Sequence, residues 1–156
     1  MNKRTLVALF LFPAVAGVLR GSAELLGPIQ REDILRHRPE WQALVASYNP
    51  KPEAVERLRD LRREVRVEVF MGTWCTDSRD RVTAYFKVLD LVDNPMIHTS
   101  CFGVPEDRSK RSRYFGGRAV EKLPTFIVYV DGKEKGRIVE TPAKSIEEDL
   151  LALIEK

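Results

Sequence analysis

The sequence predicts an α/β domain with a central mixed sheet, helices on both faces and a helical N-terminal extension. Three observations support this fold class. A short apolar run ending at Met71 is followed by glycine and then by a stretch whose apolar residues, from Val82 to Val92, have helical spacing. A second apolar run ends in Asp131-Gly132, a tight-turn signal that predicts a hairpin. Ser145 with Glu148 three residues later forms a capping box that begins the last amphipathic helix.

Composition indicates one globular domain. The chain has 156 residues, of which 44% are hydrophobic and 31% charged, and a net charge of +3. These values are ordinary for a domain with a substantial core. Because basic residues are interspersed with acidic ones, nothing indicates a nucleic-acid-binding protein.

Residues 1–23 differ from the rest of the chain. Lys3 and Arg4 precede an apolar run over residues 6–19, and Gly-Ser-Ala follows at 21–23. This pattern is typical of a secretory signal peptide cleaved after Ala23. We therefore expect an exported protein, periplasmic or extracellular. The alternative is an uncleaved anchor, but the run is shorter than the ~20 residues that a spanning helix needs. The mature chain is expected to have no integral membrane span.

Residues 24–63 are expected to form a helical extension. Apolar residues at helical spacing run from Ile34 to Tyr48 with a break at Pro39, and a further helix begins at Pro52. Within this segment Trp41 is expected in the core and His37 in solvent. No cluster of His, Cys, Asp and Glu has metal-ligand spacing, so neither a metal site nor a cofactor is expected.

The first candidate for chemistry is Cys75. Val67 to Met71 has the β-branched and aromatic composition of a strand, and Gly72-Thr73 breaks it before Trp74 and the cysteine. Cys75 is therefore placed in the first turn of the helix that follows. The unpaired N–H groups and positive dipole end of such a turn favour thiolate over thiol.

Two segments together resemble thioredoxins. The strand followed by Trp74-Cys75 and a helix is similar to the thioredoxin active-site segment, and Leu123-Pro124-Thr125 is similar to the family's cis-proline loop. The resemblance spans roughly residues 65–154, which defines a domain at 64–156. It implies that a cis Pro124 packs against the reactive Cys75. It further implies that Trp74, Leu123 and Thr125 contact an extended substrate segment.

The sequence departs from the thioredoxin pattern at two positions. Ser78 stands where the second cysteine of a dithiol thioredoxin would be, and a hydroxyl cannot displace a disulfide sulfur. Val69 stands where family members carry a buried acid, and Glu68 is expected to face the opposite side of the strand. Asp77 is the nearby acid that we expect to modulate the thiolate, because its charge opposes the effect of the helix terminus.

Cys101 is the second of the two cysteines. Residues 96–102 read as the next parallel strand, which brings Cys101 near the same sheet edge as Cys75. Two interpretations are open: a disulfide with Cys75, which export would permit, or burial of Cys101 as a small apolar residue.

Residues 106–118 concentrate positive charge. The segment is expected to contain a helix that ends at Gly116-Gly117 and leads to the Pro124 loop. It either borders the active-site edge and favours an acidic partner, or is a solvated helix face. Glu140, after the last strand, is interpreted as a loop carboxylate. The basic residues are Arg108, Lys110, Arg111, Arg113 and Arg118.

These patterns lead to three functional hypotheses. The first is thiol-disulfide exchange on proteins of the cell envelope by Cys75 alone, with Ser78 and Pro124 in the catalytic site. Its partners would be protein thiols or disulfides, with an external thiol or reductase as the resolving donor. The second is a redox-inactive module that binds proteins in the same groove. The third is a thiol peroxidase, but Thr73-Trp74-Cys75 does not place a threonine three residues before the cysteine as peroxiredoxins do.

Overall fold

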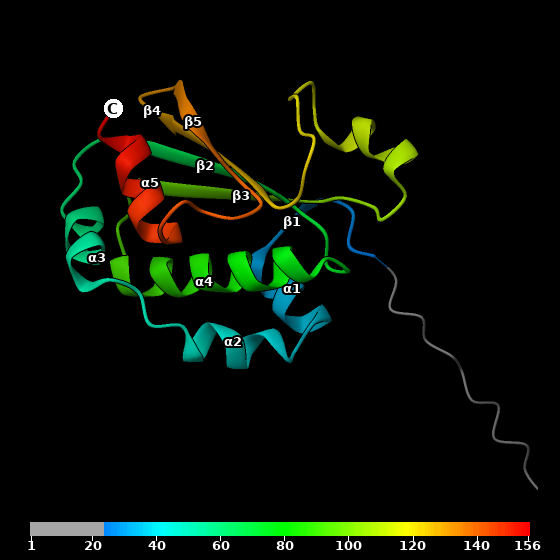
Figure 1. Ribbon diagram of the computed structural model, residues 1–156, viewed down its shortest axis with the longest axis horizontal. Helices are drawn as coiled ribbons and strands as arrows, with labels where there is room; N and C mark the ends of the chain where they lie inside the picture. The colour runs from blue at the N-terminus through cyan, green and yellow to red at the C-terminus, as the bar shows by residue number, and fades with distance from the viewer. Residues whose placement is uncertain (1–23) are drawn as a thin grey trace, which may run out of the picture.

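The computed structural model describes residues 24–156, so the expected signal peptide lies outside the described residues. No helix in the described part is long and apolar enough to cross a bilayer. The elements follow in the order β1 (Gly27–Ile29), α1 (Arg31–His37), α2 (Trp41–Ser47), α3 (Pro52–Arg59), β2 (Val65–Met71), α4 (Thr76–Val92), β3 (Ile97–Gly103), the 3-10 helix η1 (Arg108–Tyr114), β4 (Thr125–Val130), β5 (Lys133–Val139) and α5 (Ile146–Ile154) (Figure 1).

The five strands form one mixed sheet in the order β1-β3-β2-β4-β5. β2 pairs in parallel with β3 and antiparallel with β4, so it lies at the centre. Val69 is flanked by Cys101 of β3 and Phe126 of β4. Asp131 and Gly132 both have positive φ, 50° and 78°, which the tight turn between β4 and β5 requires. The predicted α/β class and its mixed sheet are confirmed.

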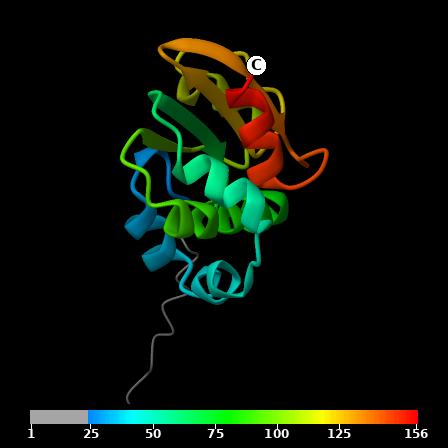
Figure 2. The same ribbon diagram turned by 90° about the vertical axis from the view of Figure 1, so that its left-hand side faces the viewer.

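All five α-helices contribute to one hydrophobic core on one face of the sheet. α4 runs along this face, and α2 lies on the side of α4 that points away from the sheet (Figures 1 and 2). The odd-numbered residues of β2 point into this core, as strand alternation requires. Trp41 of α2 is buried there, so the predicted extension shares its core with the rest of the domain.

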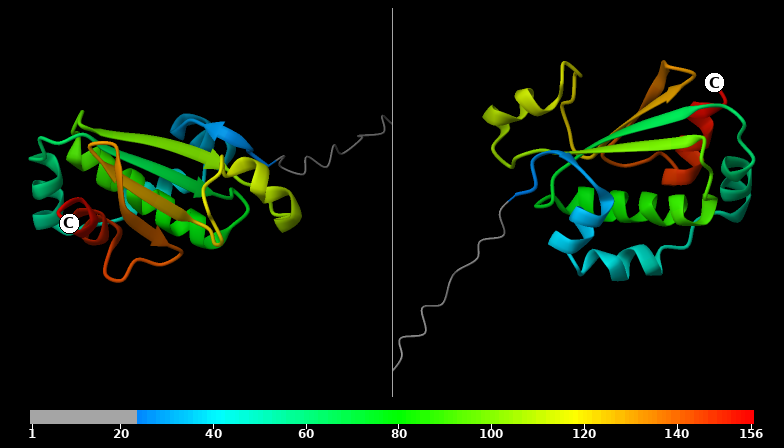
Figure 3. Two further views of the ribbon diagram at one scale, coloured as in Figure 1. Left: turned by 90° about the horizontal axis from the view of Figure 1, so that it is seen from above. Right: turned by 180° about the vertical axis from the view of Figure 1, so that it is seen from behind.

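The opposite face is covered by residues 104–124, which include η1. A smaller cluster there joins Phe70 and Ile127 of the sheet to Val104, Val120 and Leu123. Seen from above and from behind, η1 projects beyond one end of the sheet (Figure 3). The helix expected within 106–118 is thus a 3-10 helix, with no buried residue. A charged segment without an apolar stripe gains little by packing as a full α-helix.

β1 is a strand where only helices were expected. Its three residues pair antiparallel with the outer edge of β3, with Gly27 opposite Gly103. A Cβ at Gly103 would lie 2.0 Å from the carbonyl oxygen of Leu25, so only glycine permits this approach. A three-residue segment that contains Gly-Pro is too short to show alternating apolar and polar residues. The strand forms because the edge of β3 provides backbone hydrogen-bonding partners.

Candidate active site around Cys75

Cys75 is the N-cap of α4, immediately after the loop that follows β2. Its N–H donates to the carbonyl of Gly72 at 3.1 Å, and its own carbonyl accepts from Arg79 N–H at 3.0 Å. Its backbone is extended and its side chain is half-buried. The thiol is therefore at the positive end of a 17-residue helix and reachable from solvent.

The Pro124 loop lies against this thiol. The Leu123–Pro124 peptide bond is cis, and Cys75 Sγ is 3.9 Å from the carbonyl oxygen of Leu123. The side chains of Leu123, Pro124 and Thr125 are all buried. Thr125 donates its hydroxyl to the carbonyl of Lys122 at 2.7 Å. The side chain of Thr125 therefore supports the loop from within.

Trp74 is fixed over the loop that precedes the cysteine. Its indole Nε1 donates to the carbonyl of Val104 at 2.9 Å. The ring lies so close to Gly72 that a Cβ there would be 2.5 Å from the indole Cε2. The guanidinium of Arg111 lies over the ring, 4.9 Å from its centroid. These contacts make Trp74 a rigid wall beside Cys75.

Arg38 is a site residue that the sequence did not indicate. It ends α1, and its Nε and Nη2 donate to the carbonyl of Thr73 at 2.8 and 2.6 Å. The contact joins residues 35 positions apart, and neither the Arg-His-Arg context nor the spacing marks Arg38 for this role.

Two hollows open beside Cys75. The larger, about 370 Å³, lies between the start of α4, the Pro124 loop and η1, and it includes Asp77. The smaller, about 190 Å³, lies on the side of the extension, where Arg38 and Trp41 meet Thr73 and Trp74. Cys75 lines both hollows, and the two hollows with the thiol between them are here called the groove.

The basic segment lies partly against the larger hollow. Arg108 and Arg111 line the larger hollow, so part of the segment borders the active-site edge. Arg111 is also used internally, because it donates to the carbonyls of Pro105 and Glu106 at 2.9 and 2.8 Å. Glu140 lines the same hollow and pairs with Lys122 at 2.6 Å.

A family model described as Thioredoxin matches residues 30–152. The chain belongs to the thioredoxin family. Two solved structures are similar to it in fold. A protein of unknown function from Pseudomonas aeruginosa is 20% identical with a TM-score of 0.57, over 74% of this chain and 84% of that one. An HIV epitope scaffold is 19% identical with a TM-score of 0.62, over 84% and 93%. No match was found among curated proteins.

Ser78 lies three residues after Cys75, and its side chain is fully buried. Its hydroxyl oxygen accepts a hydrogen bond from the N–H of Gly72 at 3.2 Å. Ser78 therefore ties the first turn of α4 back to the end of β2. The contact holds the loop that carries Trp74 and Cys75.

Glu68 lies on the face of β2 opposite the helices, as alternation with Val69 predicts. Arg118 donates to both of its carboxylate oxygens, at 2.8 and 2.5 Å, and Arg66 and Tyr129 also donate to it. Burial acts to raise the pKa of Glu68, but Arg118, Arg66 and Tyr129 together outweigh it and the pKa is lowered. Through Arg118, this acid anchors the segment before the Pro124 loop.

Cys101 is buried within β3, and both cysteines are free thiols. It lies beside Val69 in the core between the sheet and the helices. Burial raises the pKa of the Cys101 thiol to about 12. The structure thus agrees with the interpretation of Cys101 as a small core residue.

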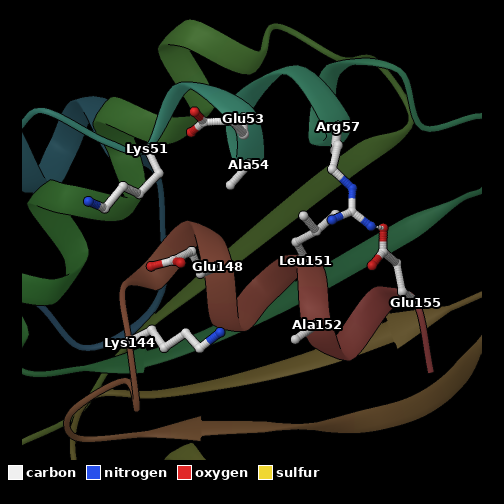
Figure 4. A pocket seen from close by; sticks show the side chains of 9 residues that line it. All are labelled: Lys51, Glu53, Ala54, Arg57, Lys144, Glu148, Leu151, Ala152 and Glu155. Carbon is white, nitrogen blue, oxygen red and sulfur yellow. Dashed lines mark hydrogen bonds and ion pairs between the residues drawn. The ribbon is translucent and has the colours of Figure 1, made fainter.

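A further hollow of about 260 Å³ lies between α3 and α5, and Figure 4 shows the side chains that line it. It is lined by cations and carboxylates that include the ion pair of Arg57 with Glu155. It contains no thiol. Among residues 24–156, no three His, Cys, Asp or Glu side chains are grouped so as to hold a metal ion.

Proposed function

We propose that this protein carries out thiol-disulfide exchange through Cys75 alone, as a monothiol oxidoreductase or isomerase acting on exported proteins. One observation carries the proposal. Cys75 is a solvent-reachable thiol at the N-terminus of α4, with its sulfur 3.9 Å from the carbonyl of Leu123 beside the cis Pro124. This is the arrangement that places a nucleophilic sulfur next to a backbone edge on which a partner chain can align.

The reaction has two balanced steps. The Cys75 thiolate attacks one sulfur of a partner disulfide, the partner's S–S bond breaks, and one partner sulfur leaves as a thiolate while a mixed disulfide forms. A second thiolate then attacks the mixed disulfide and releases Cys75 unchanged. In isomerisation this thiolate is a cysteine of the partner. In net reduction one external thiolate attacks the mixed disulfide and a second attacks the disulfide that results, so two external thiols supply the two electrons and leave as their own disulfide. Ser78 has no thiol and cannot act as either attacking group.

The described residues explain how a partner would be held. Trp74 forms one rigid wall, and the backbone of Leu123 presents its carbonyl beside the sulfur. The hollows on either side of Cys75 leave room for the residues that flank a partner cysteine. Asp77 lies in the larger hollow, where its charge acts on groups that approach the thiol.

The test is capture of a mixed disulfide. Wild-type protein and the variant Cys75→Ser are mixed with a peptide disulfide, and adducts are located by mass spectrometry of proteolytic fragments. The expected result is an adduct on the fragment that contains Cys75 and none with the variant. Scrambled ribonuclease in the presence of glutathione then measures isomerase activity, which the substitution should abolish.

The matched control is Cys101→Ala, which removes the other thiol. It should leave both activities unchanged, since Cys101 is buried with a pKa raised to about 12. Full exchange activity in Cys75→Ser, or an adduct found only at Cys101, would overturn the proposal.

The second candidate is a redox-inactive module that binds protein partners in the same groove. The observation in its favour is Ser78, whose buried hydroxyl holds the Gly72 backbone in place of a resolving thiol. If Cys75 forms no adduct but Cys75→Ser binds the same reduced peptides as the wild type, this candidate is the correct one.

Action in the cell envelope is part of the proposal and rests on the pattern of residues 1–23. An oxidising compartment supplies the disulfides on which such a protein acts. The mass of the protein recovered from the envelope, expected to begin at Glu24, tests this part.

A further inference from the structure

The extension reaches the active-site loop through the side chain of Arg38. The backbone of this residue is held on both sides: its N–H donates to the carbonyl of Ile34 at 2.9 Å, and its carbonyl accepts from Trp41 N–H at 2.9 Å. The Trp41 side chain is itself buried in the core. Arg38 therefore starts from a fixed point, from which its guanidinium reaches the loop before α4.

The acceptor is the carbonyl of Thr73, two residues before Cys75. Arg38 donates to it through Nε and Nη2, at 2.8 and 2.6 Å. β2 has already ended at Met71, so this carbonyl lies beyond the strand. Two charge-assisted hydrogen bonds from one planar guanidinium fix both the position and the direction of an acceptor, which a single ammonium donor does not.

The loop is thus held from both sides of the groove. On one side Trp74 donates to the carbonyl of Val104 at 2.9 Å, and on the other Arg38 holds the preceding peptide unit. Arg38 and Trp41 also form a wall of the smaller hollow, which Cys75 itself lines. The extension therefore completes the groove in addition to packing on α4.

We propose that Arg38 is a positioning residue for the reaction of Cys75. It holds the Thr73 carbonyl and so sets the direction of Trp74 and of the thiol relative to a partner chain. The proposal rests on the proposed thiol-disulfide exchange. It adds that the partner lies between the extension and the Pro124 loop, and that the extension controls the rate with extended substrates.

The experiment compares Arg38→Ala and Arg38→Lys with the control Arg31→Ala. Arg31 also ties the extension to α4, through Asp90 at 2.5 and 2.7 Å and by lying over the Phe86 ring, but it makes no contact with the loop. Three quantities are measured in each full-length variant: the rate constant for mixed-disulfide formation at Cys75 with a peptide disulfide, the rate of alkylation of Cys75 by iodoacetamide, and the melting temperature.

We expect Arg38→Ala to slow the reaction with the peptide disulfide by at least about tenfold, because misplacement of a reacting group by about 1 Å can cost 10²-fold. Alkylation should change less than about threefold, since a small reagent does not need the groove. Arg38→Lys should recover part of the rate through its single donor. Arg31→Ala should lower the melting temperature about as much as Arg38→Ala does, while its rate of mixed-disulfide formation should equal that of the wild type.

An unchanged peptide rate in Arg38→Ala, or an equal loss in Arg31→Ala, would overturn the proposal. If Arg38→Ala does not fold, the rate constant for mixed-disulfide formation is compared between Arg38→Lys and Arg31→Ala. A lower rate in Arg38→Lys alone supports the proposal, and equal rates overturn it.

A wild type that forms no mixed disulfide refutes the proposed exchange instead. In that case hydrogen exchange of the Cys75 amide, which donates to Gly72, decides. Faster hydrogen exchange of this amide in Arg38→Ala than in Arg31→Ala supports the positioning role of Arg38, and equal hydrogen-exchange rates refute it.

Discussion

Replacement of Ser78 by cysteine would place a second thiol three residues after Cys75. Ser78 and Cys75 are three positions apart at the start of α4, a spacing that brings Cβ atoms on a helix to about 5–6 Å. A disulfide requires Cβ atoms about 3.5–4.5 Å apart, so its formation must draw the start of α4 together by about 1–2 Å. The hydroxyl of Ser78 is buried on the N–H of Gly72, so a sulfur placed there is sheltered from other thiols.

We therefore expect Ser78→Cys to form an internal disulfide with Cys75 on oxidation. A peptide held as a mixed disulfide at Cys75 should leave at least about tenfold faster than from the wild type, because intramolecular attack has a high effective concentration. Release is followed by chromatography of the freed peptide. Ser78→Ala is the control: it removes the same hydrogen bond without adding a thiol. Equal release from both variants would contradict the expectation.

The sequence predicted the proximity of residues that belong to short motifs. Cys75, Trp74 and Pro124 belong to short motifs whose neighbours in sequence are also their neighbours in space, and the structure brings them together. Arg38 was missed because its partner, the Thr73 carbonyl, is a backbone atom 35 residues away that no side-chain pattern marks. For Thr125, the motif gives its position and not the direction of its side chain.

At the scale of elements, the segment from β3 to β4 depends on one buried carboxylate. Glu68 of β2 accepts hydrogen bonds from Arg118, whose attachment holds residues 104–124 on the sheet. The side chain of Glu68 is 4% exposed, whereas that of Arg118 is 34% exposed. The ion pair is therefore stronger than a surface pair but less costly to desolvate than a fully buried one.

We expect Glu68→Gln to lower the free energy of unfolding by about 2–3 kcal/mol at pH 7, since it leaves Arg118 and Arg66 without their charged partner. Because the pKa of Glu68 is lowered from 4.5, its stabilisation is fully present above that value and is lost as the pH falls through the folded-state pKa. The difference between wild type and variant should therefore shrink below pH 4.5.

Urea unfolding at pH 7 and at several acidic values measures this difference. Glu134→Gln removes the exposed partner of Arg137 and is the control, with an expected change of less than about 1 kcal/mol. A difference between wild type and Glu68→Gln that stays constant with pH would show that the carboxylate charge is not the cause.

Elements with a strong periodic pattern were predicted well, and those set by their surroundings were not. The α4 helix, the hairpin after Val130 and the last helix each have local signals, namely an apolar stripe, a turn pair and a cap. β1 lacks such a signal because its hydrogen bonds are made with the edge of β3. In η1, charge removes the apolar stripe, so a shorter-range 3-10 helix is found instead of the expected helix.

At the scale of the whole molecule, the extension and the rest of the domain form one hydrophobic core. Trp41 of α2 is 1% exposed and belongs to the same cluster as the central strand and α4. Arg31 and Arg38 join the extension to α4 and to the active-site loop. Loss of the extension would therefore expose core surface as well as remove one wall of the groove.

This arrangement predicts a single cooperative unfolding transition. The chain has two tryptophans, Trp41 in the extension and Trp74 at the active site. Trp74→Phe leaves a reporter of the extension, and Trp41→Phe leaves a reporter of the site. In each variant, tryptophan fluorescence and far-ultraviolet circular dichroism should give coincident urea curves, because one core cannot open in parts without exposing the remainder. If the extension unfolds first, the Trp41 fluorescence curve will have its midpoint at a lower urea concentration than the circular dichroism curve of the same protein. The reaction of Cys75 with extended substrates should then slow at urea concentrations at which the sheet is still folded.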